Sequence, residues 1–277
     1  MVDTKNTTEY YKEVGDYFDI FAKQHHEKSD TNQILSGMRD SFRTYVTHPA
    51  PKNILDIGCG PGMDVAHFAE KYPSAKVYGI DVSQGMIDYA AGMCKAKNLS
   101  NTQFINTGIE ELRQHLQEDL KFDIVYVFFG ALNTVSSLDE AAKIIDKLLK
   151  PGGQAVLTFV NKYYLSEFVV NMLKLRPGKA MARWGKVWRG YSNDYALDSK
   201  TYTPARIQKA FNNTGLQLQK RRGYSIFYPA WFQAGKLKKH PGFCKILYKV
   251  DRMANKTFLW DNGEYTLFVY NKPGNGL

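Results

Sequence analysis

The chain has 277 residues, of which 44% are hydrophobic and 23% charged, and its net charge is +10. That size and composition fit a globular protein with one Rossmann-size domain plus additions, or two small domains. No apolar run approaches the ~20 residues of a membrane span, the polar start has no signal-peptide core, and three cysteines without paired spacing indicate neither disulfides nor a metal site. A reducing cytoplasm is the simplest expected location.

The N-terminal region is predicted to be helical. Apolar and aromatic residues recur at helical spacing over residues 8–27 and 31–47. Pro49 and Pro51 then end the second helix.

From residue 53 to residue 160, short apolar runs alternate with helical segments. The predicted strands are 53–57, 76–80, 103–106, 122–128 and 154–160, and the predicted helices are 63–71, 84–97 and 138–149. The Lys-Pro-Gly-Gly run at 150–153 is expected to separate the last helix from the last strand. This alternation predicts a parallel, doubly wound α/β sheet with right-handed crossovers.

After residue 203 the pattern resumes. Thr203 and Pro204 predict the cap and first position of a helix, and two further strands are expected at 216–224 and 265–270. The predicted fold is therefore a seven-stranded, mostly parallel sheet with its last strand antiparallel.

The expected organisation is a core with three additions. The predicted segments are an N-terminal helical cap (1–50), the core (51–160), a first insertion (161–202), the rest of the core (203–226 and 263–277) and a second, basic insertion (227–262). Both insertions begin where a parallel strand ends, and ligands of such sheets bind at the carboxyl ends of the strands. We therefore expect the insertions and the N-terminal helices to form a lid over the site.

A glycine-rich turn follows the first predicted strand. Residues 54–62 read Ile-Leu-Asp-Ile-Gly-Cys-Gly-Pro-Gly, which is a strand feeding a turn and then a helix. Glycine permits backbone angles and close approaches that a Cβ forbids, and the start of a helix offers free N–H groups. The sixth position from Gly58 is Met63, so the dinucleotide fingerprint Gly-x-Gly-x-x-Gly is absent.

The second predicted strand ends in an acidic residue, Asp81. A carboxylate at the tip of that strand can accept hydrogen bonds from both hydroxyls of a ribose. A helix N-cap is the plainer alternative, but the nearby glycine turn favours the ribose.

Together these runs resemble the ordered motifs of class I S-adenosylmethionine (SAM)-dependent methyltransferases. The runs are Leu-Asp-Ile-Gly-Cys-Gly-Pro-Gly at 55–62, Gly-Ile-Asp-Val-Ser at 79–83, Phe-Asp-Ile-Val at 122–125 and Leu-Lys-Pro-Gly-Gly at 149–153. The resemblance covers residues 52–160 firmly and 204–226 more loosely. It implies SAM as the cofactor and small-molecule methyl transfer as the activity.

The resemblance also implies which residues bind SAM. The family pattern assigns the methionine part of SAM to the first strand and turn, the ribose to Asp81 and the adenine to the residues around it. An acidic residue is often found after the third strand, but here Gly108 stands in its place. The implied cofactor-binding residues are Tyr17, Asp56, Gly58, Cys59, Gly60, Asp81, Val82, Met86, Gly108, Ile109 and Phe128.

The catalytic and acceptor-binding residues are less clearly indicated. SAM carries an activated methyl group, so the protein mainly aligns the reactants and excludes water. His25, His26 and Tyr191 are candidate bases, and no metal ligands are expected. Residues 128–133 lack the Pro-Pro-Tyr type of sequence carried by family members that methylate base amines. The candidate acceptor-binding residues are Asn133, Tyr163, Trp184, Tyr195 and Phe227.

The positive charge is concentrated in one segment. Residues 171–252 contain eighteen Lys or Arg and three Asp or Glu, and a one-signed surface attracts anions. The expected function is methyl transfer to an O, N or C atom of a small, anionic or carrier- or lipid-linked acceptor. Lysines mixed with apolar residues over 236–250 suit peripheral membrane contact. An RNA-modifying enzyme, a SAM-binding protein without transferase activity and a merely solubilising basic face remain alternatives.

Overall fold

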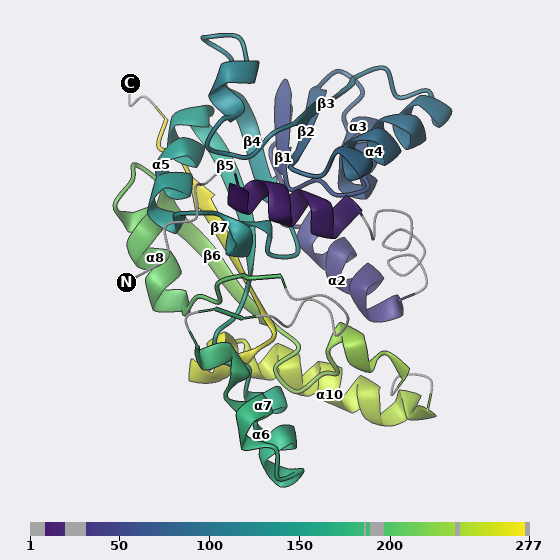
Figure 1. Cartoon of the computed structure of the whole chain (residues 1–277), viewed down its shortest axis with the longest axis vertical. Helices are drawn as coiled ribbons and strands as arrows, with labels where there is room; N and C mark the ends of the chain where they lie inside the picture. The colour runs from purple at the N-terminus through teal and green to yellow at the C-terminus, as the bar shows by residue number, and fades with distance from the viewer. Residues whose placement is uncertain (1–8, 20–31, 186, 189–196, 236–238, 275–277) are drawn as a thin grey trace.

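A computed structural model describes residues 9–19, 32–185, 187–188, 197–235 and 239–274 of the chain. They form a seven-stranded sheet in the order β3-β2-β1-β4-β5-β7-β6 (Figure 1). β7 runs antiparallel to both of its neighbours and the other pairs are parallel, which confirms the predicted fold class. The strands are β1 Asn53–Ile57, β2 Lys76–Asp81, β3 Thr102–Asn106, β4 Phe122–Val127, β5 Leu149–Val160, β6 Gln217–Tyr224 and β7 Tyr265–Asn271.

Helices cover both faces of the sheet, and each face has its own apolar core. On one face α2 (Gln33–Arg43), α3 (Met63–Lys71) and α4 (Gln84–Ala96) bury residues such as Phe42, Phe68 and Ile87. On the other face α5 (Leu138–Leu148) and α8 (Pro204–Asn212) bury Ile145 and Phe211. This two-sided burial explains why the central strands are mostly apolar.

Side-chain caps begin the helices where the sequence predicts them. The Ser83 hydroxyl accepts a hydrogen bond from the backbone N–H of Met86 at 3.0 Å. The Thr203 hydroxyl accepts one from Arg206 at 3.1 Å, with Pro204 in the first turn. Such caps satisfy N–H groups that have no partner inside the helix.

Two predicted boundaries are corrected. α2 ends at Arg43 rather than at 47, so its end is set before the prolines are reached. β5 begins at Leu149 because the Lys-Pro-Gly-Gly run joins the sheet, with a register shift against β4 and a positive φ of 79° at Gly152. Glycine adopts this backbone conformation without steric cost, so the strand can contain the irregularity at this point.

The insertions contain further short helices. The first holds α6 (Leu165–Leu173), α7 (Pro177–Ala180) and η3 (Ala182–Trp184), and the second holds η4 (Trp231–Gln233), α10 (Pro241–Ala254) and η5 (Phe258–Asn262). α6, α7 and α10 lie at the lower end of the molecule in Figure 1. Within the sheet region, η1 (Leu112–His115) and η2 (Ala131–Thr134) follow β3 and β4. Among the residues that the structure describes, no helix is long and apolar enough to cross a bilayer.

Candidate functional site

The glycine turn after β1 has the tight geometry expected from its sequence. Gly58, Gly60 and Gly62 have φ of 73°, 51° and 79°, conformations that other residues rarely adopt. The backbone N–H groups of Gly58 and Cys59 donate to the Ile80 carbonyl oxygen at 2.8 and 2.9 Å. The turn is thereby fixed against the end of β2.

Asp81, at the end of β2, faces this turn. Its carboxylate accepts hydrogen bonds from the backbone N–H of Gly60 at 2.9 Å and of Ser83 at 3.0 Å. Burial raises the pKa of Asp81, and the hydrogen bonds from Ser83 and Gly60 oppose that rise. The bend at 58–62 and the carboxylate at 81 therefore lie in one crevice.

A second acidic residue, Asp56, lies deeper in the same crevice. Its side chain is buried, and burial, reinforced by the nearby charge of Asp64, raises its pKa well above the usual range. The nearby Arg39 acts in the opposite direction. The crevice therefore contains an acidic group and a guanidinium close enough to influence each other's charge.

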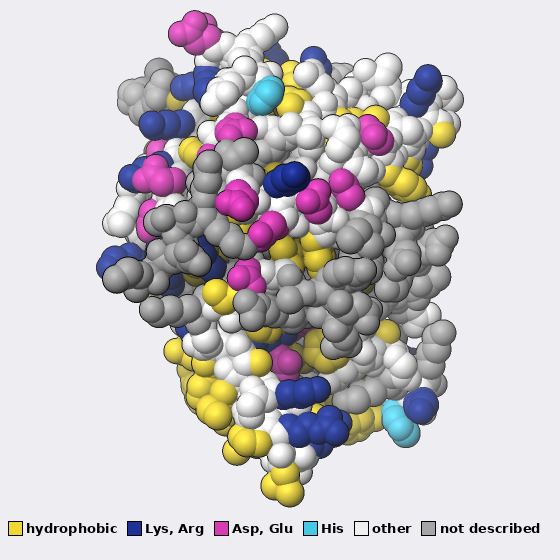
Figure 2. All heavy atoms as spheres, in the orientation of Figure 1, with side chains coloured by type: hydrophobic (Ala, Val, Ile, Leu, Met, Phe, Trp, Pro, Cys, Tyr) yellow, Lys and Arg dark blue, Asp and Glu magenta, His cyan; other side chains and the backbone are white. Residues whose placement is uncertain are grey.

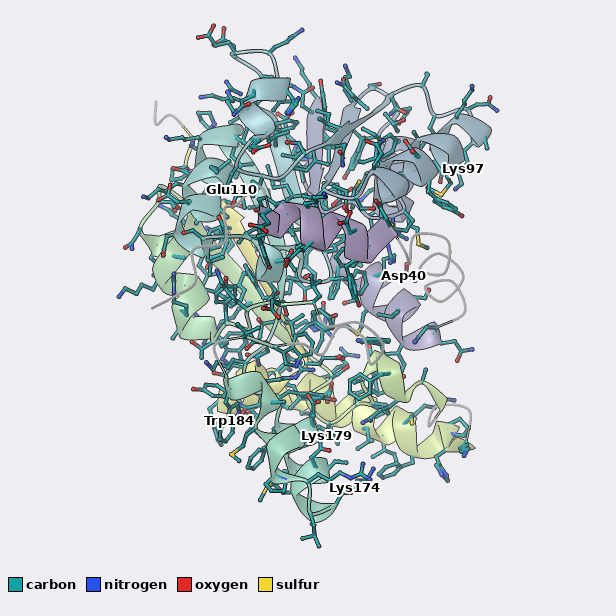
Figure 3. The ribbon with its side chains drawn as sticks, viewed as in Figure 1. Asp40, Lys97, Glu110, Lys174, Lys179 and Trp184 are labelled. Carbon is teal, nitrogen blue, oxygen red and sulfur yellow. The ribbon has the colours of Figure 1, made fainter. Side chains whose placement is uncertain are left out.

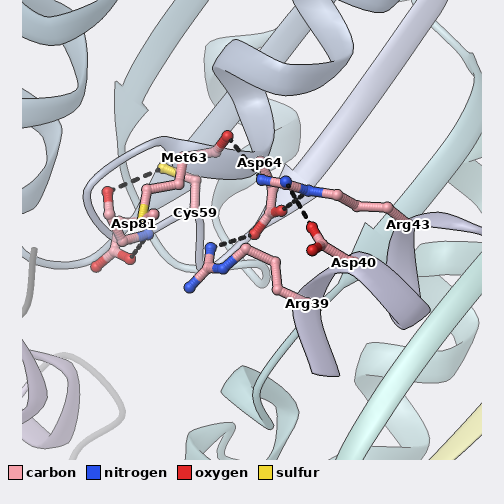
Figure 4. Close-up of polar contacts among 8 residues, drawn as sticks. Arg39, Asp40, Arg43, Cys59, Met63, Asp64 and Asp81 are labelled. Carbon is pink, nitrogen blue, oxygen red and sulfur yellow. Dashed lines mark hydrogen bonds and ion pairs between the residues drawn. The ribbon is translucent and has the colours of Figure 1, made fainter. Parts of the chain in front are cut away.

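Arg39 is held in place by an ion-pair cluster between α2 and α3 (Figure 4). Asp64, in the first turn of α3, accepts from Arg39 Nη1 at 2.6 Å and from Arg43 Nε at 2.7 Å. The two arginines lie one turn apart on α2, so both reach the same carboxylate. Arg39 also stacks over the Phe129 ring, with Cζ 4.8 Å from its centroid.

The N-terminal helix, residues 9–19, closes the crevice from outside. Asp19 accepts hydrogen bonds from the Ser83 hydroxyl at 2.5 Å and from the Gly85 N–H at 2.9 Å, at the start of α4. Tyr11 donates to the Glu110 carboxylate, which lies beside this helix (Figure 3). The Tyr11 ring packs against Gly108, in the space that a side chain at position 108 would need. The predicted covering role of the N-terminal region therefore has a structural basis in these contacts.

Gly15 allows this close approach, and its replacement gives a test of the cover. A Cβ at Gly15 would lie 2.8 Å from the Val82 carbonyl oxygen, whereas a Cβ at Gly37 in α2 would have nothing within 4 Å. We expect Gly15→Val to displace the helix and weaken SAM binding roughly tenfold, measured by calorimetry. Gly37→Val is the matched control because it has the same helix-propensity cost. Equal affinities of the two variants would contradict the cover.

These elements enclose a cavity of about 310 Å³. All eleven predicted cofactor-binding residues line it. They are Tyr17, Asp56, Gly58, Cys59, Gly60, Asp81, Val82, Met86, Gly108, Ile109 and Phe128. The motifs thus meet in one place, although they are spread along the sequence.

Several lining residues were not predicted. They come from α2, from the first turn of α3 and from the start of β7, and they are Leu35, Arg39, Asp64 and Tyr265. Phe129 of the loop after β4 and Trp231 of the second insertion, which was expected to form part of the lid, also line the cavity. Phe129 has a positive φ of 54°, which is strained for a bulky residue and typical of functional sites. The spacing of Arg39 and Arg43 on a predicted helix was a usable signal for the part of the lining that α2 contributes.

Four of the five predicted acceptor-binding residues, Asn133, Tyr163, Trp184 and Phe227, belong to the described part of the chain, and none of the four lines the cavity. Asn133 is fully buried, and its side chain bonds to Val160 N–H at 2.9 Å and to the carbonyls of Val160 and Lys200, so it serves the fold. Tyr163 and Trp184 are exposed and pack edge-to-face, with Trp184 at the lower end of the molecule (Figure 3). The backbone of Phe227 is held by Asp251 at 2.6 Å.

The two insertions expected to form the lid differ in their relation to the cavity. No described residue of 161–202 lines the cavity, whereas Trp231 of the second insertion does. His25, His26, Tyr191 and Tyr195 lie outside the described residues.

Glu264, which directly precedes the cavity-lining residue Tyr265, is buried next to Trp231. It exposes 2% of its surface, and burial raises its pKa to about 7, against the opposing effect of Arg183. Among the described residues its Oε2 atom has no hydrogen-bond partner. Glu264 therefore holds a proton at pH values where an exposed glutamate has lost it.

This shift predicts a pH-dependent stability. An unfolded glutamate titrates near 4.5 and Glu264 near 7, so the folded state loses stability as the pH rises between these values. We expect the free energy of unfolding of Glu264→Gln, relative to that of the wild type, to increase by on the order of 2–3 kcal/mol as the pH rises from about 5 to about 8. Denaturant unfolding at each pH measures this difference. Glu118→Gln, at an exposed position, is the control. A difference that does not change with pH would contradict the assignment.

Comparisons with known proteins agree with this geometry. A family model described as a methyltransferase domain matches residues 50–226. The chain is 31% identical over 146 residues to a demethylmenaquinone methyltransferase of Lactobacillus johnsonii, covering 50% of this chain and 58% of that protein. It is 26% identical over 176 residues to a ubiquinone biosynthesis O-methyltransferase of Acinetobacter baylyi, covering 58% and 71%. The matches span about half to three fifths of the length of the first curated relatives.

Solved structures share the whole fold. The (4+2)-cyclase SpnF superposes with a TM-score of 0.65 at 18% identity, covering 95% of this chain and 96% of that one. A putative SAM-dependent methyltransferase from Listeria monocytogenes gives a TM-score of 0.60 at 18% identity, covering 86% and 97%. At these identities the likeness concerns the fold alone. The family match over residues 50–226, more than half of the sequence, shows that the chain belongs to the class I SAM-dependent methyltransferases.

Proposed function

We propose that this protein transfers the methyl group of SAM to a small, largely apolar acceptor. The observation that supports this most strongly is the cavity itself, because eleven residues predicted to bind SAM from separate motifs line it together. The proposal covers the activity of the whole chain, which the family match alone leaves open.

The donor groups in the cavity fit SAM. Asp81 offers a carboxylate for the two ribose hydroxyls, and Val82 and Met86 offer apolar surface for the adenine. The Asp56 carboxyl group and the Arg39 guanidinium line the same space, and such a pair suits the ammonium and carboxylate of an amino acid. When bound, SAM supplies an activated methyl group.

The rest of the lining suggests the kind of acceptor. Phe128, Phe129, Trp231 and Tyr265 are aromatic, and Arg39, the cation of the lining, is already paired with Asp64. Such a wall favours an apolar or lipid-linked acceptor over a small free anion. The relatives named for demethylmenaquinone and ubiquinone biosynthesis are consistent with an aromatic, quinone-like acceptor.

The chain contributes mainly enclosure and alignment. The N-terminal helix covers the crevice through Gly15 and Asp19, and the aromatic wall excludes water from the transferred group. Aromatic faces also stabilise a cationic methyl group.

The proposal is tested in two steps. Calorimetry with SAM measures cofactor binding, and mass spectrometry of mixtures with a panel of phenols, quinols and acidic analogues measures product formation. We expect SAM binding and preferential methylation of an apolar aromatic acceptor. Absence of SAM binding would overturn the cofactor site, while binding without any product, or methylation of RNA alone, would overturn the proposed acceptor class.

A further inference from the structure

Helix α10 exposes apolar side chains and buries an acid, which is the reverse of ordinary surface patterning. Phe243, Ile246 and Met253 are 61%, 59% and 70% exposed, and at helical spacing they form one stripe together with Val250. On the buried side, Asp251 accepts hydrogen bonds from the backbone N–H groups of residues 226–228 at 2.6–3.1 Å. The core therefore does not account for the apolar stripe.

Helix α6 repeats this feature. Its sequence, Leu-Ser-Glu-Phe-Val-Val-Asn-Met-Leu, is strongly apolar, yet none of its residues is buried. Leu173, and Leu175 just beyond it, are 79% and 88% exposed. Two apolar helices left open to solvent mark an interaction surface.

Basic side chains predominate beside these apolar ones, and the half-buried acid of α6, Glu167, is paired with Arg183. Over residues 169–185 and 239–258 the exposed ionisable side chains are basic, and the one acid, Asp251, is buried. The exposed Lys and Arg residues are Lys174, Arg176, Lys179, Lys239, Lys245, Lys249, Arg252 and Lys256. On α10, Lys245, Lys249 and Arg252 form a stripe next to the apolar one.

Both helices lie at the same end of the molecule. Figure 1 places α6, α7 and α10 at the lower end of the long axis, and the lowest part of the face in Figure 2 shows hydrophobic and basic side chains, with acidic ones gathered higher up. We call this end, formed by residues 169–185 and 239–258, the basic–apolar end.

This end is connected to the cavity. Asp251 of α10 holds the backbone of residues 226–228, and this segment leads into Trp231, which lines the cavity. A partner bound on α10 would therefore sit one short loop away from the acceptor side of the site.

We propose that the basic–apolar end docks on the surface of an anionic lipid bilayer. Exposed apolar side chains insert at the headgroup level while flanking Lys and Arg residues pair with anionic headgroups, a combination that binds interfaces without spanning them. Nucleic acid explains the cations but not the exposed Leu173, Ile246 and Met253. The inference does not depend on the identity of the methyl acceptor.

Flotation with lipid vesicles tests the docking. The full chain is mixed with vesicles of phosphatidylcholine alone or with about one third phosphatidylglycerol, at low salt and at ~0.5 M NaCl. We expect binding to the anionic vesicles only, and less of it at high salt. Lys245→Gln with Lys249→Gln should lower the partition coefficient about tenfold or more, and Phe243→Ser with Ile246→Ser should lower it similarly.

A control variant loses two positive charges at positions outside the basic–apolar end. Lys95→Gln with Lys121→Gln removes two exposed lysines outside the basic–apolar end and should leave partitioning unchanged, while calorimetry with SAM checks that each variant is folded. Failure of the wild type to bind anionic vesicles would overturn the proposal. So would equal losses in the control, or a dimer in light scattering that Phe243→Ser with Ile246→Ser dissociates.

Discussion

Replacing Asp81 with alanine is expected to weaken SAM binding at least 100-fold. Hydrogen bonds to a charged group contribute about 1.5–3 kcal/mol each, and a ribose diol bound by one carboxylate makes two of them, so about 3 kcal/mol or more is lost. The same carboxylate orients the Gly60 and Ser83 N–H groups, and that support is lost as well. Calorimetric titration of SAM measures the change directly.

The control variant, Asp88→Ala, removes a negative charge near Asp81 from a residue that does not line the cavity. Asp88 lies exposed on α4, where it accepts a hydrogen bond from Gln84 Nε2 at 2.7 Å, and it does not line the cavity. We expect Asp88→Ala to bind SAM within about twofold of the wild type, because exposed charges act weakly. An affinity of Asp81→Ala similar to that of Asp88→Ala would remove Asp81 from the site.

The cofactor side of the site was predictable because local sequence sets its geometry. Gly58 and Gly60 must adopt positive φ at the end of β1, and Asp81 must end β2. In a parallel sheet the ends of neighbouring strands meet at one edge. The order of the strands then brings these residues together without any information on distant contacts.

The acceptor side was not predictable for the opposite reason. Asn133 and Trp184 have residue types that suit a binding site, but the packing of distant segments decides where they point. Asn133 is used by Val160 and Lys200, whereas Trp231 reaches the cavity because Asp251 and Asn32 hold the surrounding backbone. Such contacts join residues separated by up to 199 positions, and no local pattern encodes them.

Gly58→Ala is expected to lower the free energy of unfolding by about 2–5 kcal/mol. A left-handed backbone costs a residue with a side chain about 1–2 kcal/mol, and a Cβ at this position would overlap the Cβ of Ala131, for which overpacking adds about 1–3 kcal/mol. Both residues line the cavity, so SAM binding should also weaken. Denaturant unfolding and calorimetry measure the two effects.

A double variant separates the two causes. Ala131→Gly removes the overlapping methyl group, so Gly58→Ala with Ala131→Gly should recover the steric part while the cost of the positive φ remains. Because Ala131→Gly alone also changes stability, the four proteins are compared as a double-mutant cycle, with an expected coupling of about 1–3 kcal/mol. Additive effects would mean that the glycine turn and the loop after β4 are not in contact, and the enclosed shape of the SAM site would then have to rest on other residues.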